Sequence, residues 1–171
     1  MKFKEILKKV ESSKEYDSFI LNHPNAEICA GFFILDFLSN DNKSSIDYKE
    51  GEKIFTFNIN EDKIEINEDK LISAPNFQKL EKINTEIKID IEEIRKISQE
   101  KAIEKGIGAK FNKIIAILQN HINPENQEKS LVWNLTCMLE QLIIIHIIID
   151  AKSGNIIKFE RKSFMDLIKQ K

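Results

Sequence analysis

The sequence has few of the residues that mark several classes of protein. Cysteine occurs twice, and because Cys29 and Cys137 lie far apart in apolar segments, we interpret both as small buried side chains in preference to a disulfide or a reactive thiol. Only two of the 26 basic residues are arginine, and the formal net charge is −2. A protein that binds nucleic acid by neutralising phosphates is usually strongly basic, so we expect no nucleic-acid partner.

Export and membrane signals are also lacking. The most apolar stretch, residues 131–149, is interrupted by Glu140, and each apolar flank is about half as long as a membrane-spanning helix requires. The N-terminus carries positive charge without the apolar core of a signal peptide. We therefore expect a cytoplasmic protein without membrane segments. Its 171 residues are enough to fold without disulfides or metal.

Motifs for catalysis or metal binding are missing as well. The histidines His23, His121 and His146 have no partner at the spacing of metal ligands. The glycines at 106 and 108 lack the residues that complete a phosphate-binding loop, and the acidic run 61–69 lacks the residue order of a calcium loop. The sequence therefore predicts no cofactor, no metal and no enzymatic activity.

Hydrophobic periodicity predicts helices followed by strands, and this order occurs twice. In the first part of the chain we expect a helix at 3–10, a second helix that begins at Ser12 and ends before Pro24, a strand at 26–38 for which helix is an alternative, a loop at 39–52, and a hairpin at 53–67 that turns at 60–62. In the second part we expect a short helix after Pro75 carrying Phe77, Leu80 and Ile83, a strand at 86–92, a helix from Ser98 to Lys105, strands at 112–119, 130–139, 142–149 and 155–161, and a last helix from Ser163.

Short links between the expected strands favour antiparallel pairing, and segregated helices favour an α+β fold. We predict helices packed on a mostly antiparallel sheet. The chain is organised either as two similar helix-plus-sheet halves, 1–91 and 92–171, or around one shared core. Trp133 shares a strand face with four apolar residues and is expected in that core.

Residues 94–159 resemble a PepSY domain. The segment IRKISQEKAIEKG is similar to the opening of that family, an Ile-Ser pair followed by a helix with Ala-Ile, and LVWNLTC is similar to a strand that begins with an aromatic residue. The segment IIIDAKSGNII is similar to the family's Ile-Asp, two residues, a small residue with glycine, and an aliphatic pair. The resemblance implies a helix on a small antiparallel sheet, a PepSY/cystatin-like arrangement, and a peptidase-modulating or chaperone-like role.

The last of these segments also has a physical interpretation of its own. The Asp150 carboxylate can accept hydrogen bonds from backbone N–H groups two or three residues further on. Gly154 supplies the positive φ that closes such a loop. We therefore predict that Asp150, Ser153 and Gly154 form a turn, with a binding site as the alternative.

The expected strand 142–149 is apolar on both faces. One face carries Ile143, Ile145, Ile147 and Ile149, the other carries Leu142, Ile144 and Ile148, and only His146 is polar. A sheet with one wet face alternates polar and apolar residues, so both faces should be covered. The cover is either the same chain, giving a monomer, or a second copy in a homodimer, for which Ile143, Ile145 and Ile147 are the candidate interface residues.

Two functions remain open from the sequence. The first is a non-enzymatic binding or regulatory module with a protein partner. The second is a small-molecule-binding protein or an enzyme that uses a pocket between helix and sheet. For His146 the alternatives are a hydrogen-bonded histidine on a strand and a buried pH switch or ligand contact. A deep apolar pocket near His146 or Trp133 would favour the second function, and a filled core with an exposed apolar patch would favour the first.

Overall fold

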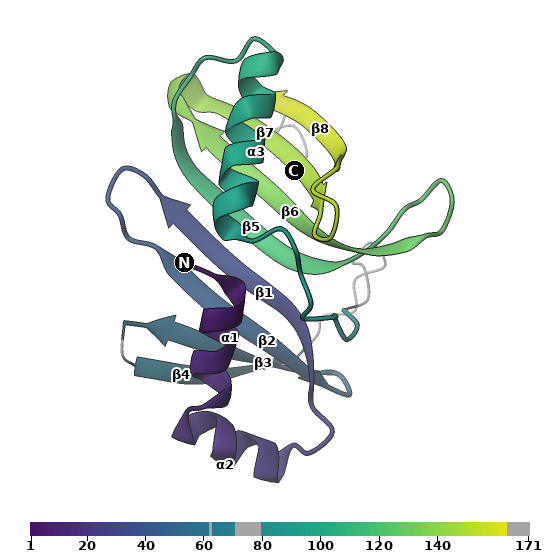
Figure 1. Cartoon of the computed structure of the whole chain (residues 1–171). Helices are drawn as coiled ribbons and strands as arrows, with labels where there is room; N and C mark the ends of the chain where they lie inside the picture. Colours follow the sequence, from purple (N-terminus) through teal and green to yellow (C-terminus); the bar gives the residue numbers. More distant parts are fainter. Residues whose placement is uncertain (62, 71–79, 164–171) are drawn as a thin grey trace.

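A computed structural model of the chain describes all residues except 62, 71–79 and 164–171. Its strands form one antiparallel sheet of eight strands in the order β4-β3-β2-β1-β5-β6-β7-β8 (Figure 1). The strands are β1 (Glu27–Asp36), β2 (Lys43–Glu50), β3 (Lys53–Asn60), β4 (Lys63–Lys70), β5 (Phe111–Ile122), β6 (Lys129–Leu139), β7 (Ile143–Asp150) and β8 (Ile156–Ser163). The expected α+β class with antiparallel pairing is confirmed.

The described residues contain three α-helices, of which two precede β1 and the third precedes β5. They are α1 (Phe3–Glu11), α2 (Lys14–Asn22) and α3 (Ile91–Glu104). Side chains satisfy the first N–H groups of α2 and α3 locally. The Ser13 hydroxyl accepts a hydrogen bond from the Tyr16 N–H, so α2 begins one residue later than Ser12 predicts. It ends before Pro24, as expected.

The N-terminus of α3 also serves α1. The Asp90 carboxylate accepts the Ile91 N–H at 2.7 Å, and the Glu93 carboxylate accepts the Asp90 N–H at 2.9 Å, which completes a capping box. The same Asp90 oxygen accepts the N–H of Phe3 at 2.9 Å, although Lys2 gives α1 no side-chain cap. One carboxylate therefore lies at the N-termini of two helices that are far apart in the sequence.

Aromatic side chains connect the helices to the strands. The Phe3 ring on α1 lies 6.3 Å from Phe33 on β1, with the two rings edge to face. On α2 the Phe19 ring lies 5.0 Å from Phe55 and 5.1 Å from Phe57, both on β3. Most of the buried residues form one hydrophobic cluster, which includes side chains from α1, α2 and α3 and from strands on both sides of the central β1–β5 pair.

Trp133 occupies the middle of this cluster. It is fully buried, and its ring lies 5.7 Å from Phe33 across the centre of the sheet. The indole N–H donates to the Ile89 carbonyl at 2.8 Å, so the buried polar atom is satisfied. The expectation of a core tryptophan is confirmed.

Two predicted elements that lie wholly within the described residues are wrong. Most of the expected loop 39–52 is the strand β2, because Ile46 and Tyr48 alternate with polar residues and are buried against the helices. The expected strand 86–92 is an irregular segment followed by the start of α3, which begins seven residues before Ser98. Ser98 is no N-cap: it lies buried inside α3, and its hydroxyl donates to the Ile94 carbonyl at 2.6 Å.

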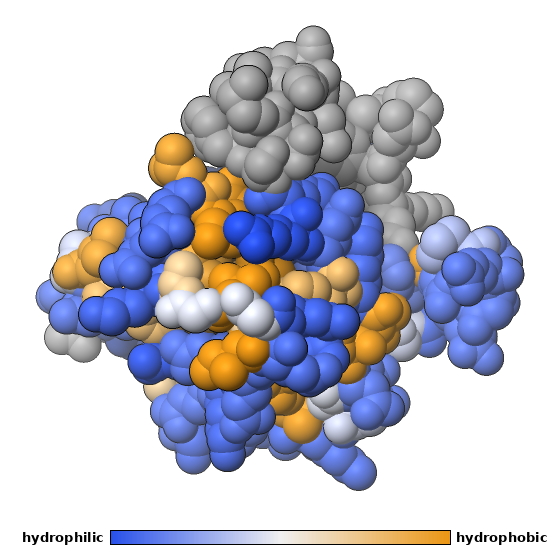
Figure 2. Space-filling model, turned by 90° about the horizontal axis from the view of Figure 1, so that it is seen from above, coloured by the Kyte–Doolittle hydropathy of each residue, from blue (hydrophilic) through white to orange (hydrophobic). Residues whose placement is uncertain are grey.

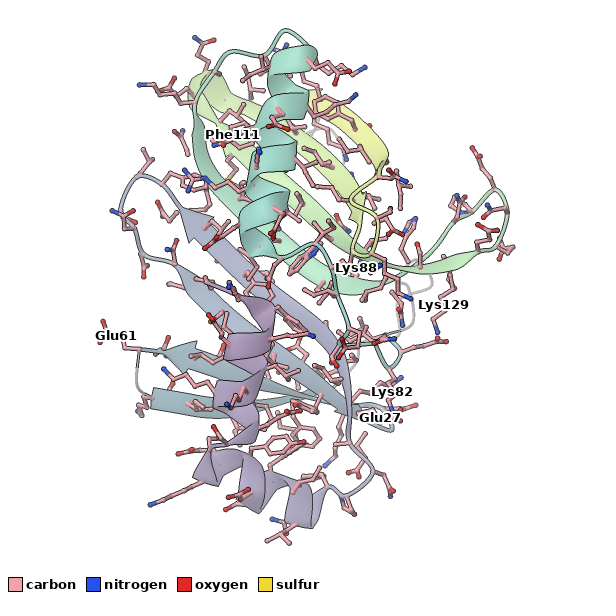
Figure 3. All side chains as sticks on the ribbon, in the orientation of Figure 1. Glu27, Glu61, Lys82, Lys88, Phe111 and Lys129 are labelled. Atoms are coloured by element: carbon pink, nitrogen blue, oxygen red, sulfur yellow. The ribbon has the colours of Figure 1, made fainter. Side chains whose placement is uncertain are left out.

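The segment 80–90 runs from the central strand β1 to the residue that follows β7, and it does not pair as a strand. Ile83 donates its N–H to the Ile28 carbonyl on β1, and Lys82 forms an ion pair of 3.2 Å with Glu27 (Figure 3). At the other end, the N–H groups of Lys88 and Ile89 both donate to the Ala151 carbonyl after β7. Ile87 and Ile89 are thus partly buried residues of a connecting segment. The main-chain partners of this segment are Ile28 on β1 and Ala151 just after β7, two strands that are not neighbours in the sheet.

The other predicted strands and the hairpin at 53–67 are present, with ends that differ by up to three residues. The expected Leu142 at the start of β7 lies instead in the turn before it, where Gln141 and Leu142 both have positive φ. The last predicted helix, from Ser163, and the helix after Pro75 with Phe77 fall largely outside the described residues. Within the described part of that second prediction, Leu80 and Ile83 are not helical.

Truncation of Trp133 tests the core. We expect Trp133→Ala to lower the free energy of unfolding by about 3–5 kcal/mol, the cost of removing a large aromatic side chain from a packed core. Trp133→Phe keeps one aromatic ring in the core and loses part of the packing and the bond to Ile89, so it should cost less than Trp133→Ala. Urea denaturation followed by circular dichroism measures both. Native fluorescence with the emission maximum of water-exposed indole would contradict this assignment.

Removal of the Asp90 carboxylate tests the shared cap. Asp90→Ala should lower the free energy of unfolding by about 2 kcal/mol, since a helix cap and a bond to the Phe3 N–H are lost together. Asp90→Asn retains an oxygen acceptor and should recover most of this loss. Equal destabilisation by both variants, measured by urea unfolding, would show that hydrogen-bond acceptance is not what Asp90 contributes.

Candidate functional site

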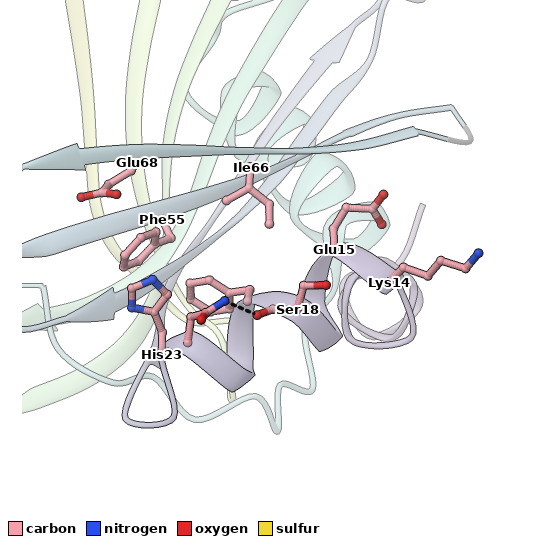
Figure 4. Close-up of a pocket in the computed structure, with 9 residues that line it drawn as sticks. Lys14, Glu15, Ser18, His23, Phe55, Ile66 and Glu68 are labelled. Carbon is pink, nitrogen blue, oxygen red and sulfur yellow. Dashed lines mark hydrogen bonds between the residues drawn. The ribbon is translucent and has the colours of Figure 1, made fainter.

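The clearest surface hollow in the described part of the chain is a groove between α2 and the β3–β4 hairpin (Figure 4). Its volume is about 570 Å³, and most of it is open to solvent. One face of α2 forms one wall, and β3 and β4 form the other. The lining residues are Lys14, Glu15, Ser18, Phe19, Asn22, His23, Phe55, Ile66 and Glu68.

The floor of the groove is apolar. Phe19 and Phe55 are buried beneath it, while Ile66 on β4 is 36% exposed, which makes it the apolar side chain most available there. Position 66 has this exposure because, among the described residues, β4 is the last strand of the sheet and no further strand pairs with it. The groove therefore offers a small apolar surface at the edge of the sheet, a place where an aliphatic or aromatic group can be desolvated.

His23 closes one end of the groove. It follows the last residue of α2, and its ring lies 4.3 Å from Phe55 and 5.0 Å from Phe19. Its Nδ1 lies 2.6 Å from a carboxylate oxygen of Glu50, whose other oxygen accepts the Asn25 N–H. The two rings and the carboxylate therefore surround the imidazole, which lies next to Phe55 at one end of the groove (Figure 4).

Charged side chains form the rim. Lys14 and Glu15 lie on α2, and Glu68 on β4 pairs with Lys53 at a distance of 2.8 Å. The Asn22 amide donates to the Ser18 carbonyl at 2.9 Å, which leaves its side-chain oxygen as an acceptor at the α2 wall. An apolar floor with a mixed polar rim suits a ligand that carries an apolar side chain on a polar main chain.

The predicted interface strip lies in the core. Ile145 and Ile147 are fully buried within a single chain, and Ile143 is half-buried. They face the same cluster as Leu135 and Trp133, to which β7 is joined through the β6–β7 pairing. Ile145 and Ile147 therefore have no exposed surface to offer to a second copy.

The other face of β7 holds His146 between two buried aliphatic residues, Ile144 and Ile148. The Nε2 of His146 lies 2.7 Å from the Asn134 side-chain oxygen, so Nε2 carries the proton in the neutral ring. Its Nδ1 is buried and has no hydrogen-bond partner among the described residues. Burial first, then the positive charges of Lys158 and Lys162, lower the pKa of His146 below its usual value.

The other residues singled out from the sequence have structural roles. The Asp150 carboxylate accepts the N–H groups of Lys152 and Ser153 at 2.9 and 2.7 Å, and Gly154 has a φ of 77°, so the predicted turn is confirmed. These bonds outweigh the effect of burial and lower the pKa of Asp150. Cys29 and Cys137 are buried free thiols, and burial raises the pKa of each to about 12, which makes both poor nucleophiles.

Other exposed apolar side chains are separate from the groove. Leu38 after β1, Leu142 before β7 and Ile103 in the last turn of α3 are each at least 70% exposed. Seen from above, apolar residues form small patches among hydrophilic ones (Figure 2). Single exposed apolar residues are common on protein surfaces. No helix in the described residues is long and apolar enough to cross a membrane.

Comparison with known proteins gives a fold and no family. No family model matches the chain, and no curated protein matches it. Among solved structures the chain is similar to the crystal structure of a "putative lipoprotein" from Clostridium difficile 630, with a TM-score of 0.57 and 13% sequence identity. The similarity covers 86% of this chain and 90% of that one. At this identity the similarity supports the fold alone.

The sequence analysis missed the groove. The sequence places Phe55 in the expected hairpin 53–67 and shows His23 only as a histidine without metal-ligand spacing. The Phe19–His23 pair at i and i+4 was the available signal, because it extends the apolar face of α2 by one polar ring. Nothing in the sequence places Ile66 and Glu68 opposite that face.

Titration of His146 tests its buried environment. We expect its NMR-detected pKa below the usual value of about 6.5, identified by comparison with His146→Asn. A pKa that is lower in the folded state means that the unfolded chain binds the proton more tightly. His146 therefore has no effect on stability above the pKa of the unfolded chain, about 6.5, and destabilises the fold as the pH falls below that value. A titration midpoint at or above about 6.5 would contradict the assignment.

Proposed function

We propose that this protein is a non-enzymatic binding module that recognises a protein partner through the groove between α2 and the β3–β4 hairpin. The groove itself is the observation that carries the proposal: an open hollow with Ile66 accessible on its floor and a charged rim. A partner segment would place an apolar side chain against Ile66 and Phe55. Its main chain would meet the polar groups of Ser18 and Asn22.

We infer further that the chain consists of two similar halves, 1–91 and 92–171, each a helix followed by a four-stranded meander, and that the second half is PepSY-like. The sheet order supports this inference, since β4-β3-β2-β1 and β5-β6-β7-β8 run outward in opposite directions from the central β1–β5 pair. Among the described residues, only the first half has a second helix, α2. The groove is formed by α2, the helix that distinguishes the first half from the second.

The filled core favours a protein partner over a small molecule. Trp133 is fully buried and bonded to Ile89, and the groove residues do not include it. The groove is open, whereas sites for small molecules usually enclose most of the ligand surface. A peptidase-modulating role, which the PepSY resemblance implies, is one form of such a module.

Selection from a phage-displayed library of random peptides on the immobilised full chain tests the proposal. Ser18 is exposed on the α2 wall, so Ser18→Tyr should fill the groove without disturbing the core. Enriched peptides should bind the variant at least about tenfold more weakly, a loss of roughly 1.4 kcal/mol. Glu100→Tyr, on the exposed side of α3, is the matched control and should bind like the parent.

Two results would contradict the proposal. One is that no peptide is enriched over the unselected library. The other is that enriched peptides bind Ser18→Tyr and the parent equally. A small molecule that raises the melting temperature of the parent but not of Ser18→Tyr would favour the small-molecule alternative at the same groove.

A further inference from the structure

The two edges of the sheet differ in regularity. At one edge β4 pairs with β3 over eight consecutive residue pairs, from Lys53–Lys70 to Asn60–Lys63, without a register shift. At the other edge the pairing of β8 with β7 is interrupted by a shift next to Ile149. Irregularities of this kind protect a sheet edge from pairing with another chain. The β4 edge has none, so it is the edge better suited to receive a further strand.

The hairpin turn determines which main-chain groups β4 presents at that edge. The pair Asn60–Lys63 closes the hairpin with two residues between them, and such a closing pair exchanges hydrogen bonds. Bonding and non-bonding positions alternate along an antiparallel strand. Lys63, Glu65 and Asn67 therefore direct their main-chain groups toward β3, whereas Ile64, Ile66 and Glu68 direct theirs outward.

We propose that β4 pairs with β4 of a second copy of this chain, in antiparallel orientation, with Ile66 directly opposite Ile66 of the partner subunit. The two copies are related by a two-fold axis perpendicular to the sheet, and their sheets become continuous. This places the homodimer interface at the β4 edge, away from the buried strip on β7. The proposal does not depend on what the groove binds.

Charge complementarity selects this register. A two-fold axis perpendicular to the sheet leaves each side chain on the same face of the continuous sheet. The axis must therefore pass midway between one residue of β4 and the same residue of the partner subunit. With the axis at Ile66, Lys63 lies opposite the partner's Asp69, and symmetry repeats this pair. With the axis at Asn67, Glu65 would lie opposite the partner's Asp69. With the axis at Glu65 or at Glu68, two glutamates would meet at the centre. With the axis at Ile64, Lys63 would lie opposite the partner's Glu65, but only residues 63–65 of β4 would pair, whereas residues 63–69 pair with the axis at Ile66. Charge and the length of paired strand together therefore favour the axis at Ile66.

The chemistry at the centre is also self-complementary. Ile66 is 36% exposed in the single chain, and pairing two such side chains removes apolar surface from water. The outward N–H and C=O of each Ile66 meet those of the other, as a hydrogen-bonded pair requires. Because Ile66 and Glu68 line the groove, the partner strand would add a wall beside it in each subunit.

Sedimentation velocity on the full chain from about 1 to 100 µM measures the association. We expect a dimer whose dissociation constant rises about tenfold or more in Lys63→Asp and in Asp69→Lys, because each change turns two cross-strand attractions into repulsions. The double variant Lys63→Asp/Asp69→Lys restores both attractions and should dimerise like the parent. Ile66→Lys should give a folded monomer, since the side chain is already partly exposed.

Ile157→Lys is the matched control, because Ile157 is 41% exposed and lies on the opposite edge strand β8. It should leave the dimer unchanged, and circular dichroism should show each variant folded. A monomeric parent over the whole concentration range overturns the proposal, as does a dimer that Ile66→Lys does not weaken. If both single charge variants and the double variant are weakened equally, the proposed register is wrong. Peptide binding by a monomeric parent would support the proposed function while the dimer fails.

Discussion

The pairing of β1 with β5 is the contact on which the sheet depends. It runs from Gly31–Leu118 to Asp36–Lys113 and joins two sets of four strands that are each connected by short turns. Without it, each set would expose the edge of a central strand to water or to another chain. The pair also brings Phe33 on β1 next to Trp133 on β6, so the largest side chains of the two sets share one core.

The close packing at this centre depends on Gly31. A β-carbon at position 31 would lie 2.9 Å from the Phe33 ring and 3.3 Å from the Phe3 ring. Any larger residue would push α1 away from β1 or displace Phe33, and the contact between Phe33 and Trp133 would change with it. Position 31 must therefore be glycine for reasons of space, because the Phe3 side chain of α1 packs directly against the central strand there.

The strands with strong alternation could be predicted from the sequence, and the elements decided by distant contacts could not. The run around Trp133 has an apolar residue at every second position, the run around Ile145 is almost entirely isoleucine, and both are strands. β2 was missed because only Ile46 and Tyr48 are apolar in a polar segment, and their burial depends on α1 and α2 above them. In 86–92 the alternation of isoleucines suggested a strand, but the Asp90–Glu93 capping box starts a helix there.

The same distinction applies to the candidate site. The turn at Asp150 is local, and its donors lie two and three residues away, so the sequence contains all of it. The groove brings α2 next to β4, residues about fifty positions apart in the chain, and only the order of the strands decides that β4 is an edge. The covering of β7 by the same chain is equally non-local. Periodicity predicts that a face is buried, but it does not identify the covering segment.

The Asp90 carboxylate, which lies at the N-termini of α1 and α3, affects the order in which a nascent chain can fold. Phe3 is synthesised 87 residues before the residue that accepts its N–H. β1 likewise leaves the ribosome well before β5, its central neighbour. The first half of the chain is therefore synthesised with the N-terminus of α1 uncapped and one edge of β1 unpaired. Both are satisfied only after the second half has emerged. Because an unpaired strand edge favours aggregation, synthesis of this chain passes through an aggregation-prone stage at mid-length.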